Sequence, residues 1–266
     1  MFTLNVAEQK ENAPDQKKIN WYSRVVIVIA GFLIVLFALY LIILVSLPDV
    51  ENLKNKNPVT TALIEQRREE NKQNHKKFNV KQHWISFNEI PDLLKKTIRI
   101  SEDANFYFHS GVDFDELEES IKKNFEKGEF ARGGSTITQQ LAKNLYLSTE
   151  KSILRKAREY FIARKLESVL SKSRIFHLYL NVIEFGPGVF GVSAAANYYF
   201  GKPVTELSHE EIIRLTAIIP RPLKVRADSD NKWLLWRCRW ITGKLLLYKY
   251  IDEVEYSRLM YIFTPV

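Results

Sequence analysis

The hydrophobic residues of this chain form one long uninterrupted run, followed by a series of shorter periodic segments. Residues 25–47 contain no charged side chain. As a helix they would extend about 35 Å at ~1.5 Å per residue, enough to cross a hydrocarbon layer of ~30 Å. The run is too long for a cleaved signal peptide, and Ser46-Leu47-Pro48 is a poor cleavage site. We therefore predict an uncleaved transmembrane helix over residues 25–47.

Beyond this run, apolar residues recur every three or four positions, which is the period of amphipathic helices. Ile90, Leu94 and Ile98 predict a helix that begins after Pro91 and ends near Glu102. No strand pattern and no internal repeat is evident, so the sequence predicts a mainly α fold. Further helices, bounded by capping residues, glycine or proline, are predicted over residues 113–128, 137–145, 149–170, 173–185, 193–200 and 208–219, with two more in the last forty residues.

Composition divides the chain around the predicted transmembrane helix. Residues 1–24 are polar, and the basic residues that precede the apolar run predict a cytoplasmic tail. Residues 48–80 are charged and rich in Lys, Asn and Gln, which predicts a stalk. Residues 81–266 are numerous enough to bury a core. The predicted order is cytoplasmic tail, transmembrane helix, stalk and one helical domain.

The net charge of +8 limits the classes of partner. Residues 1–24 hold four basic and three acidic side chains, so most of the excess lies after them. A basic domain next to a bilayer favours anionic headgroups or an anionic substrate. Nucleic acid is the rival partner, but zinc-ligand spacing, RNA-binding aromatic motifs and a basic zipper are all missing from the sequence, so we expect none. Cys238 is the single cysteine, which excludes an internal disulfide.

Residues 101–111, S-E-D-A-N-F-Y-F-H-S-G, combine two adjacent acids with aromatic rings, a histidine and a glycine. Glu102 falls near the end of its predicted helix. Nearby rings could partly desolvate its carboxylate and raise the pKa towards the range of a general base. A solvated Glu-Asp pair is the ordinary alternative, and it is favoured if this stretch is taken alone.

Residues 133–144, G-G-S-T-I-T-Q-Q-L-A-K-N, form a second motif about thirty residues further on. The glycines let the backbone approach a ligand, and the Ser/Thr run supplies caps and donors at a helix start that suits phosphate. Gln139 and Lys143 share one helix face, with Gln140 and Asn144 beside them. Taken alone, a Gly-Gly turn before a capped helix is common.

Together, the two motifs resemble the first two signatures of the peptidoglycan glycosyltransferases, glycosyltransferase family 51. The family pattern G-G-S-T-I-T-Q-Q-x-x-K-N is met at every stated position from Gly133 to Asn144. The resemblance covers about residues 80–225, and the chain most resembles the monofunctional biosynthetic transglycosylases. The other signatures are E-D-x-x-F-x-x-H-x-G, met by Glu102, Asp103, Phe106, His109 and Gly111; R-K-x-x-E, met by Arg155, Lys156 and Glu159; and R-I-x-x-x-Y-L-N, met by Arg174, Ile175, Tyr179, Leu180 and Asn181.

This resemblance implies a lysozyme-like glycosyltransferase domain with a small membrane-associated lobe, on the periplasmic face of the bacterial inner membrane. It implies that lipid II is polymerised into glycan strands, with inversion at the anomeric carbon and release of polyprenyl pyrophosphate. The expected partners are lipid II, the growing lipid-linked strand, membrane lipids and penicillin-binding transpeptidases. The expected cofactor, if there is one, is a divalent cation, Mg²⁺ or Mn²⁺.

The resemblance also implies roles for individual residues. Glu102 is the predicted base, and Glu159 is the second catalytic acid, which either holds the divalent cation or orients Arg155. Lys143, Arg155 and Lys156 are predicted to bind the pyrophosphate, because ammonium and guanidinium groups pair with its oxygens. The ordinary alternative for Arg155 and Glu159 is an exposed i,i+4 ion pair. The other predicted substrate-binding residues are Ser135, Thr136, Gln139, Gln140 and Asn144, together with Asp103, Phe106 and His109, which we expect mainly to shape the loop after Glu102.

Two alternatives to a polymerising enzyme are kept. A muramidase or lytic transglycosylase would share a lysozyme-like lobe and a catalytic glutamate, but it would not need a pyrophosphate-binding cluster. A non-catalytic cell-wall scaffold would need neither. The sequence departs from many relatives at His177, where they carry glutamate, and we predict a packing or supporting role for this residue.

Overall fold

The computed structural model describes residues 16–127, 134–150 and 152–264. Residues 1–15 of the predicted cytoplasmic tail and Gly133 of the second motif lie outside the described residues. The chain divides into two compact units, Met1–Leu47 and Pro48–Val266.

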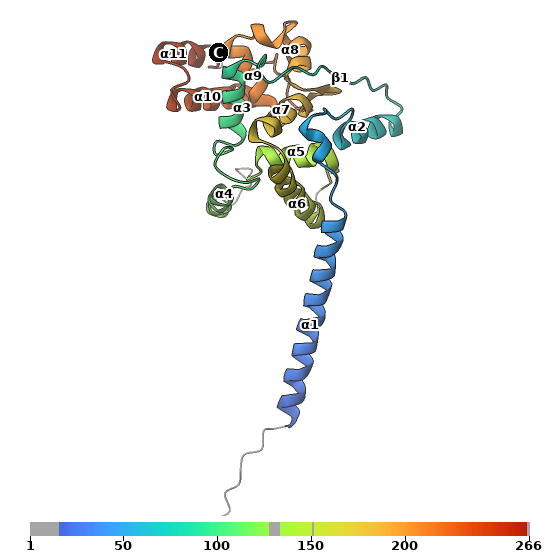
Figure 1. Ribbon diagram of the computed structural model, residues 1–266. Coiled ribbons are helices and arrows are strands. Elements are labelled where there is room, and N and C mark those ends of the chain that lie inside the picture. The colour runs from blue at the N-terminus through green and yellow to red at the C-terminus, as the bar shows by residue number, and fades with distance from the viewer. Residues whose placement is uncertain (1–15, 128–133, 151, 265–266) are drawn as a thin grey trace, which may run out of the picture. The chain divides into compact units, whose positions relative to one another are not determined.

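The first unit contains helix α1, Gln16–Val45 (Figure 1). Its stretch Trp21–Val45 is 25 residues long and is the single helix in the described part of the chain with the length and composition to cross a membrane. Most of its apolar side chains are exposed. A helix that is apolar on every face and whose side chains are exposed is typical of a membrane-spanning segment and not of a core helix. The helix therefore indicates membrane anchoring, and the bounds of its apolar stretch, Trp21–Val45, differ from the predicted 25–47 by a few residues.

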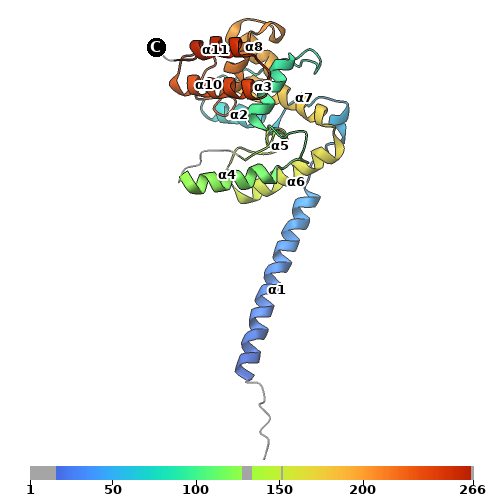
Figure 2. The same cartoon turned by 90° about the vertical axis from the view of Figure 1, so that its left-hand side faces the viewer.

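The second unit is mainly helical, as predicted (Figures 1 and 2). Among its described residues the α-helices are α2 Ala62–Gln73, α3 Asp92–Glu102, α4 Phe114–Lys127, α5 Ile137–Tyr146, α6 Ile153–Val169, α7 Lys172–Val182, α8 Val192–Phe200, α9 His209–Ile218, α10 Lys232–Leu247 and α11 Glu253–Ile262; the short 3₁₀ helices are η1 Glu51–Lys54 and η2 Val204–Glu206.

Helix α5 is a central element of this unit and packs against α2, α6 and α7. Its predicted apolar stripe, Ile137, Leu141 and Leu145, is buried. Its start is fixed by a capping box, in which Thr136 and Gln139 exchange hydrogen bonds between side chain and backbone. A second group of helices, α3, α9, α10 and α11, packs together beside it. The site described below lies where α3 and α10 meet the start of α5.

The mainly α fold also contains three short strands where no strand pattern is evident in the sequence: β1 Lys81–Gln82, β2 Glu184–Gly186 and β3 Val189–Phe190. They pair in the order β1-β3-β2, with β1 parallel and β2 antiparallel to β3. The helix predicted to reach Phe185 ends at Val182, and the chain turns back through a hairpin. At Gly188, φ is 74° and a Cβ would lie 2.4 Å from the carbonyl oxygen of Asn79, so only glycine fits. Strands of two or three residues are too short to give an alternating pattern.

Residues 48–80 belong to the folded unit, so the prediction of a separate stalk is corrected. Leu63 and Ile64, in the first turn of α2, are buried and form a small cluster with Phe190 and Phe78. The rest of α2 is polar, but one of its polar residues, Arg67, makes a buried ion pair with Glu184 of β2. Composition alone could not distinguish this helix from a linker, because two apolar residues and one ion pair fix it to the domain.

His177 connects α7 to the segment before α3. Its Nε2 lies 2.9 Å from the carbonyl oxygen of Ile85, and its Nδ1 lies 3.0 Å from Nη1 of Arg174. Because a carbonyl only accepts and a guanidinium only donates, the ring is neutral with its proton on Nε2. Burial lowers the pKa of His177, and the charge of Arg174 lowers it further, although the hydrogen bond to Ile85 opposes this. The predicted supporting role of His177 therefore fits the structure.

We predict that His177 makes the domain less stable in mild acid. Its pKa is lower in the folded state than the ~6.5 of an unfolded chain, so its contribution is complete above that pH and is lost as the pH falls through the folded pKa. His177→Gln, which keeps a neutral donor and acceptor, should flatten the fall in melting temperature between about pH 7 and pH 5. The same acid dependence in both proteins would contradict this assignment.

Candidate active site

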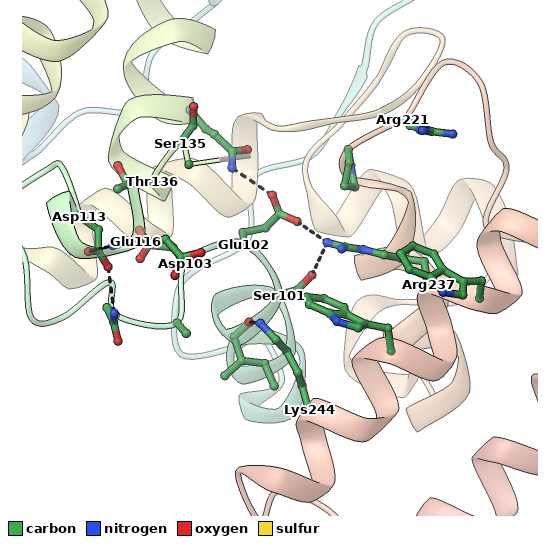
Figure 3. Close-up of a pocket in the computed structure, with 18 of the residues that line it drawn as sticks. Ser101, Glu102, Asp103, Asp113, Glu116, Ser135, Thr136, Arg221, Arg237 and Lys244 are labelled. Atoms are coloured by element: carbon green, nitrogen blue, oxygen red, sulfur yellow. Dashed lines mark hydrogen bonds and ion pairs between the residues drawn. The ribbon is translucent and has the colours of Figure 1, made fainter. Parts of the chain in front are cut away.

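Glu102, the last residue of α3, has a side chain that is 9% exposed. Its Oε2 accepts a hydrogen bond from Nε2 of Gln140 at 3.0 Å, and Nη2 of Arg237 lies 3.5 Å from its Oε1 (Figure 3). Oε1 is buried and accepts no hydrogen bond from the described residues. The alternative of a solvated Glu-Asp pair is therefore wrong for this carboxylate.

Burial raises the pKa of Glu102 above the ordinary glutamate value. The charges of Arg237 and Lys244 and the hydrogen bond from Gln140 act in the opposite direction, but the loss of water around the carboxylate dominates. A carboxylate with a raised pKa is a better proton acceptor than an exposed one. The side chain is therefore suited to general base catalysis, and its pKa is shifted in the direction that the sequence predicted.

A cavity of about 750 Å³ opens beside Glu102. One wall is formed by the end of α3 and the residues around the start of α5, and it includes the predicted residues Asp103, Ser135, Thr136 and Gln140. The opposite wall comes from α10 and the turn before it, and its residues are Arg221, Trp233, Trp236, Arg237, Trp240 and Lys244 (Figure 3).

The α10 wall was not predicted, because its tryptophans suggested a packing helix. Trp236 is 52% exposed, and both Trp233 and Trp240 line the cavity. The spacing of residues 233, 236, 237, 240 and 244 is that of one helix face, which was the available signal. Its mixture of aromatic and basic residues distinguishes that face from the apolar stripe of a core helix.

The cations of the α10 wall rest on its aromatic rings. Arg221 lies 4.5 Å from the ring centre of Trp233, and Arg237 and Lys244 each lie 4.3 Å from that of Trp240. Nζ of Lys244 also donates to the carbonyl oxygen of Ile100 at 2.7 Å, which connects α10 to α3. These contacts hold positive charge beside Glu102 in fixed positions.

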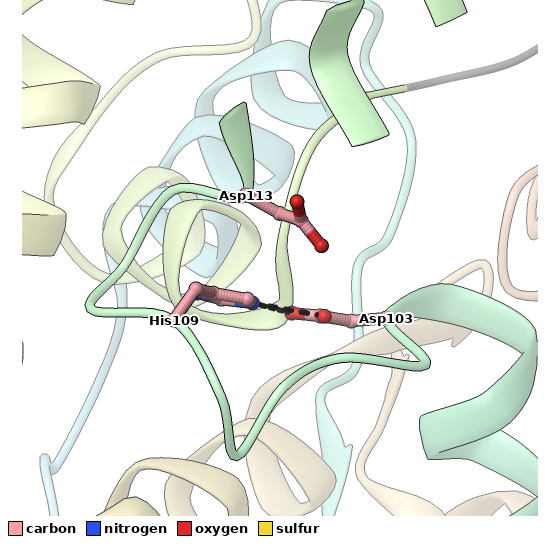
Figure 4. Close-up of side chains that lie close together, drawn as sticks. All are labelled: Asp103, His109 and Asp113. Carbon is pink, nitrogen blue, oxygen red and sulfur yellow. Dashed lines mark hydrogen bonds and ion pairs between the residues drawn. The ribbon is translucent and has the colours of Figure 1, made fainter. Parts of the chain in front are cut away.

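Asp103 connects the first motif to the second. Its Oδ2 accepts from the backbone N–H of Ile137 at 2.9 Å, at the start of α5, and Nε2 of His109 lies 3.0 Å from Oδ1 (Figure 4). Thr136 Oγ1 donates to the carbonyl oxygen of Gly111 at 2.6 Å. Asp103 and His109 therefore hold the start of α5 against the loop after Glu102, which agrees with the shaping role expected for them.

Three of the predicted substrate-binding residues are buried away from a direct binding role. Phe106 is completely buried and packs on Phe176, with ring centres 5.6 Å apart. Gln139 is buried, and its Oε1 accepts the backbone N–H of Thr136 as part of the capping box. Asn144 is also buried. These three side chains belong to the packing beneath the site, and direct contact between them and substrate stays a prediction.

Tyr179 belongs to the fourth motif, R-I-x-x-x-Y-L-N, and the structure places it in the site. It is completely buried, and its hydroxyl donates to Oε1 of Gln140 at 3.0 Å. Because a deprotonated carboxylate only accepts, the amide nitrogen of Gln140 faces Glu102 and its amide oxygen accepts from Tyr179. The chain Tyr179–Gln140–Glu102 therefore fixes which end of the amide meets the carboxylate.

A second group of charges surrounds Glu159 on α6. Glu159 is buried, and its two oxygens are bonded separately by Nη1 of Arg155, at 2.6 Å, and by Nζ of Lys156. Lys156 also donates to Oγ of Ser135 at 3.0 Å, and Ser135 lines the cavity. Burial lowers the pKa of Lys143, and the charges of Arg155 and Lys156 lower it further, while that of Glu159 raises it. The three predicted pyrophosphate-binding cations are therefore together in the structure.

The acidic residues near the site do not offer an open set of metal ligands. Both oxygens of Glu159 are already bonded by cations. Asp103, His109 and Asp113 lie within metal-binding distance of one another (Figure 4). However, Asp103 is engaged by Ile137 and His109, and the two oxygens of Asp113 accept from Glu116 and Asn105. A divalent cation at either group of described residues would therefore compete with these hydrogen bonds and ion pairs for the carboxylate oxygens.

The site places a desolvated carboxylate opposite aromatic rings and fixed cations, an arrangement suited to an enzyme whose substrate carries negative charge. A transglycosylase family model matches residues 69–246. The biosynthetic peptidoglycan transglycosylase of Nitrosospira multiformis is 42% identical over 71% of this chain and 82% of its own length. The protein of the same name from Alcanivorax borkumensis is 40% identical, over 77% of this chain and 81% of its own. The chain belongs to the transglycosylase family, as its motifs predicted.

We predict that Asp103 stabilises the fold. Asp103→Asn should cost about 1–3 kcal/mol, because one of its two oxygen acceptors becomes a donor and the negative charge that strengthens the bonds to Ile137 and His109 is lost. The check is the free energy of unfolding in urea, with Asp115→Asn as the control. Asp115 is exposed in the first turn of α4, and its substitution should change stability by no more than about 0.5 kcal/mol. Equal small losses in both variants would contradict the connecting role.

Proposed function

We propose that this chain is a peptidoglycan glycosyltransferase that polymerises lipid II into glycan strands. The observation that carries the proposal is the buried carboxylate of Glu102, with its raised pKa, facing a cavity walled by tryptophans and cations. The relatives named above are biosynthetic peptidoglycan transglycosylases, and the chain spans most of their length. Both lines support the same reaction.

In the proposed reaction Glu102 is the general base. Its carboxylate removes the proton from the 4-hydroxyl of the acceptor sugar, and that oxygen forms a bond to the anomeric carbon of the donor. The bond from this carbon to the phosphate oxygen breaks, and polyprenyl pyrophosphate leaves with the electron pair, so the linkage inverts from α to β. Gln140, held by Tyr179, keeps one carboxylate oxygen in place. The other, Oε1, lies 3.5 Å from Nη2 of Arg237, and the carboxylate held between these two contacts is the proposed proton acceptor.

The departing pyrophosphate needs positive charge, which Lys143, Arg155 and Lys156 supply in this proposal. Glu159 orients Arg155 and Lys156 through its two ion pairs. Of the two predicted roles for Glu159, this one is favoured, because its oxygens are occupied. The contact from Lys156 to Ser135 connects this cluster to the cavity. Fixed charges of this kind stabilise a developing anion without having to reorganise during the reaction.

The membrane location follows the same proposal. Helix α1 would be the single-pass anchor in the inner membrane, and the basic residues before it support a cytoplasmic amino terminus. The domain would then lie on the periplasmic face, where lipid II is used. Phe114 and Leu117 are exposed on α4, which supports the predicted membrane-associated lobe. Penicillin-binding transpeptidases would act on the finished strands and are proposed partners.

The two alternatives are weaker on specific observations. A muramidase or lytic transglycosylase cuts a neutral glycosidic bond and has no use for three cations around Glu159. A scaffold would have no reason to bury an ionisable carboxylate beside an open cavity, because such burial costs stability unless function requires it.

Glu102→Gln should lower the rate of lipid II polymerisation by about 10²- to 10⁴-fold, because the amide cannot accept the hydroxyl proton. The shape of the side chain is kept, so the melting temperature should change little. Glu253→Gln, at an exposed position in the first turn of α11, is the matched control and should polymerise like wild type. Undiminished polymerisation by Glu102→Gln would remove the proposed base.

The pH profile of kcat/KM should show an acidic limb produced by Glu102. The active form is deprotonated, so activity falls as the pH drops through the carboxyl pKa. Because burial raises that pKa, the midpoint should lie above the ~4.3 of an ordinary glutamate. Initial rates with lipid II in detergent across the acidic range measure it. A midpoint at or below the ordinary value would contradict the environment described for Glu102.

A further inference from the structure

Three consecutive residues at the end of α3 are each contacted by a cation from α10. Nζ of Lys244 donates to the carbonyl oxygen of Ile100 at 2.7 Å. Nη2 of Arg237 donates to Oγ of Ser101 at 3.0 Å and lies 3.5 Å from Oε1 of Glu102 (Figure 3). Two side chains of α10 therefore fix the end of α3 that carries the carboxylate, although the two helices are far apart in the sequence.

Arg237 is itself held in place by its surroundings. Its guanidinium lies 4.3 Å from the ring centre of Trp240, about one turn further along α10. Its side chain is 16% exposed, and Glu102 is the one acidic residue in the described part of the chain within ion-pair distance of it. This contact joins one nitrogen to one oxygen and is not the bidentate fork that arginine often forms with a carboxylate. Arg237 therefore places charge beside Glu102 without closing both of its oxygens.

This position of Arg237 costs stability. Its Nε is buried and has no hydrogen-bond partner among the described residues, and the same holds for Oε1 of Glu102. Buried polar atoms without partners lower the stability of a fold. Burial also lowers the pKa of Arg237, although the charge of Glu102 raises it. Groups that are unfavourable for folding in this way are typical of functional sites.

We propose that Arg237 is a positioning residue that holds the carboxylate of Glu102 in its charged form and against the cavity. The guanidinium supplies positive charge 3.5 Å from Oε1, while Gln140 donates to Oε2, so each oxygen has its own support. Among the described groups, the charge of Arg237 is the largest influence that opposes the effect of burial on the pKa of Glu102. This inference rests on the proposed role of Glu102 as the base.

Arg237 also lines the cavity, so direct binding of a substrate phosphate is the competing role. The two roles differ in what they require of Glu102. A residue that acts through Glu102 affects turnover, and its effect disappears once the carboxylate is replaced. A residue that binds phosphate affects KM, and its effect persists without the carboxylate.

The test is a double-mutant cycle on the full-length protein in detergent, with kcat and KM for lipid II as readouts. Arg237→Met should lower kcat by about 10- to 100-fold and leave KM within about twofold of wild type. In the Glu102→Gln background, the same substitution should change the residual kcat by less than about twofold. Arg237→Lys keeps the charge and should recover kcat to within about fivefold of wild type.

The matched control is Arg239→Met, the same change on another face of α10. Arg239 donates to the carbonyl oxygen of Phe263 at 2.7 Å and does not line the cavity. Its substitution should leave kcat and KM for lipid II at the wild-type values. A fall in kcat equal to that of Arg237→Met would show that the loss of any arginine from α10 impairs the enzyme, and it would overturn the proposal.

The outcomes separate the two claims. If Glu102→Gln polymerises lipid II at the wild-type rate, the proposed base fails. If Glu102→Gln is impaired but Arg237→Met keeps a wild-type kcat, raises KM, or lowers the rate equally in both backgrounds, the role of Arg237 is overturned. Should Arg237→Met not fold, Arg237→Gln carries the test, since it removes the charge but keeps a donor. Its kcat should fall about tenfold only where Glu102 is present, and any other pattern counts against the proposal.

Discussion

The hydrogen bond from Gln140 to Glu102 is the interaction on which the site depends, because it joins helices from separate parts of the sequence at the reacting carboxylate. Glu102 ends α3, Gln140 lies on α5, and Tyr179 on α7 fixes the orientation of the Gln140 amide. A carboxylate taken out of water retains its charge only where such donors and nearby cations compensate for lost hydration. Here the compensation is partial, so burial raises the pKa of Glu102. The packing of these three helices therefore makes the carboxylate of Glu102 more basic than an exposed glutamate.

The charges around this carboxylate form two groups with different supports. On α10, cations rest on tryptophan rings and line the cavity directly. Around Glu159, Arg155 and Lys156 are held by its buried carboxylate, and the contact from Lys156 to Ser135 connects them to the cavity. A base beside one cationic wall, with a second group of cations around Glu159, suits a reaction that brings together two lipid-linked, negatively charged substrates, one as donor and one as acceptor. The aromatic faces of α10 offer the sugar rings an apolar surface that the Glu159 side lacks.

The sequence predicted the elements whose chemistry is local and missed those that depend on distant partners. Three features depend only on residues close together in the sequence. They are the apolar run of α1, the stripe and capping box of α5, and the group Arg155, Lys156 and Glu159. Burial of Phe106 and Gln139 was not visible, because a motif records which residues are present and not which way they point. The α2 helix looked like a linker, since the ion pair that fixes it joins residues 67 and 184. The α10 wall looked like core, because tryptophan serves both purposes.

The most direct measurement is a crystal structure of the Glu102→Gln variant with a lipid II analogue and a short lipid-linked acceptor strand. The account predicts the acceptor 4-hydroxyl within hydrogen-bonding distance of the residue 102 side chain, and the donor pyrophosphate against Lys143, Arg155 and Lys156. A hydroxyl placed elsewhere, with the pyrophosphate held by Arg237 and Lys244 on the α10 wall, would contradict it.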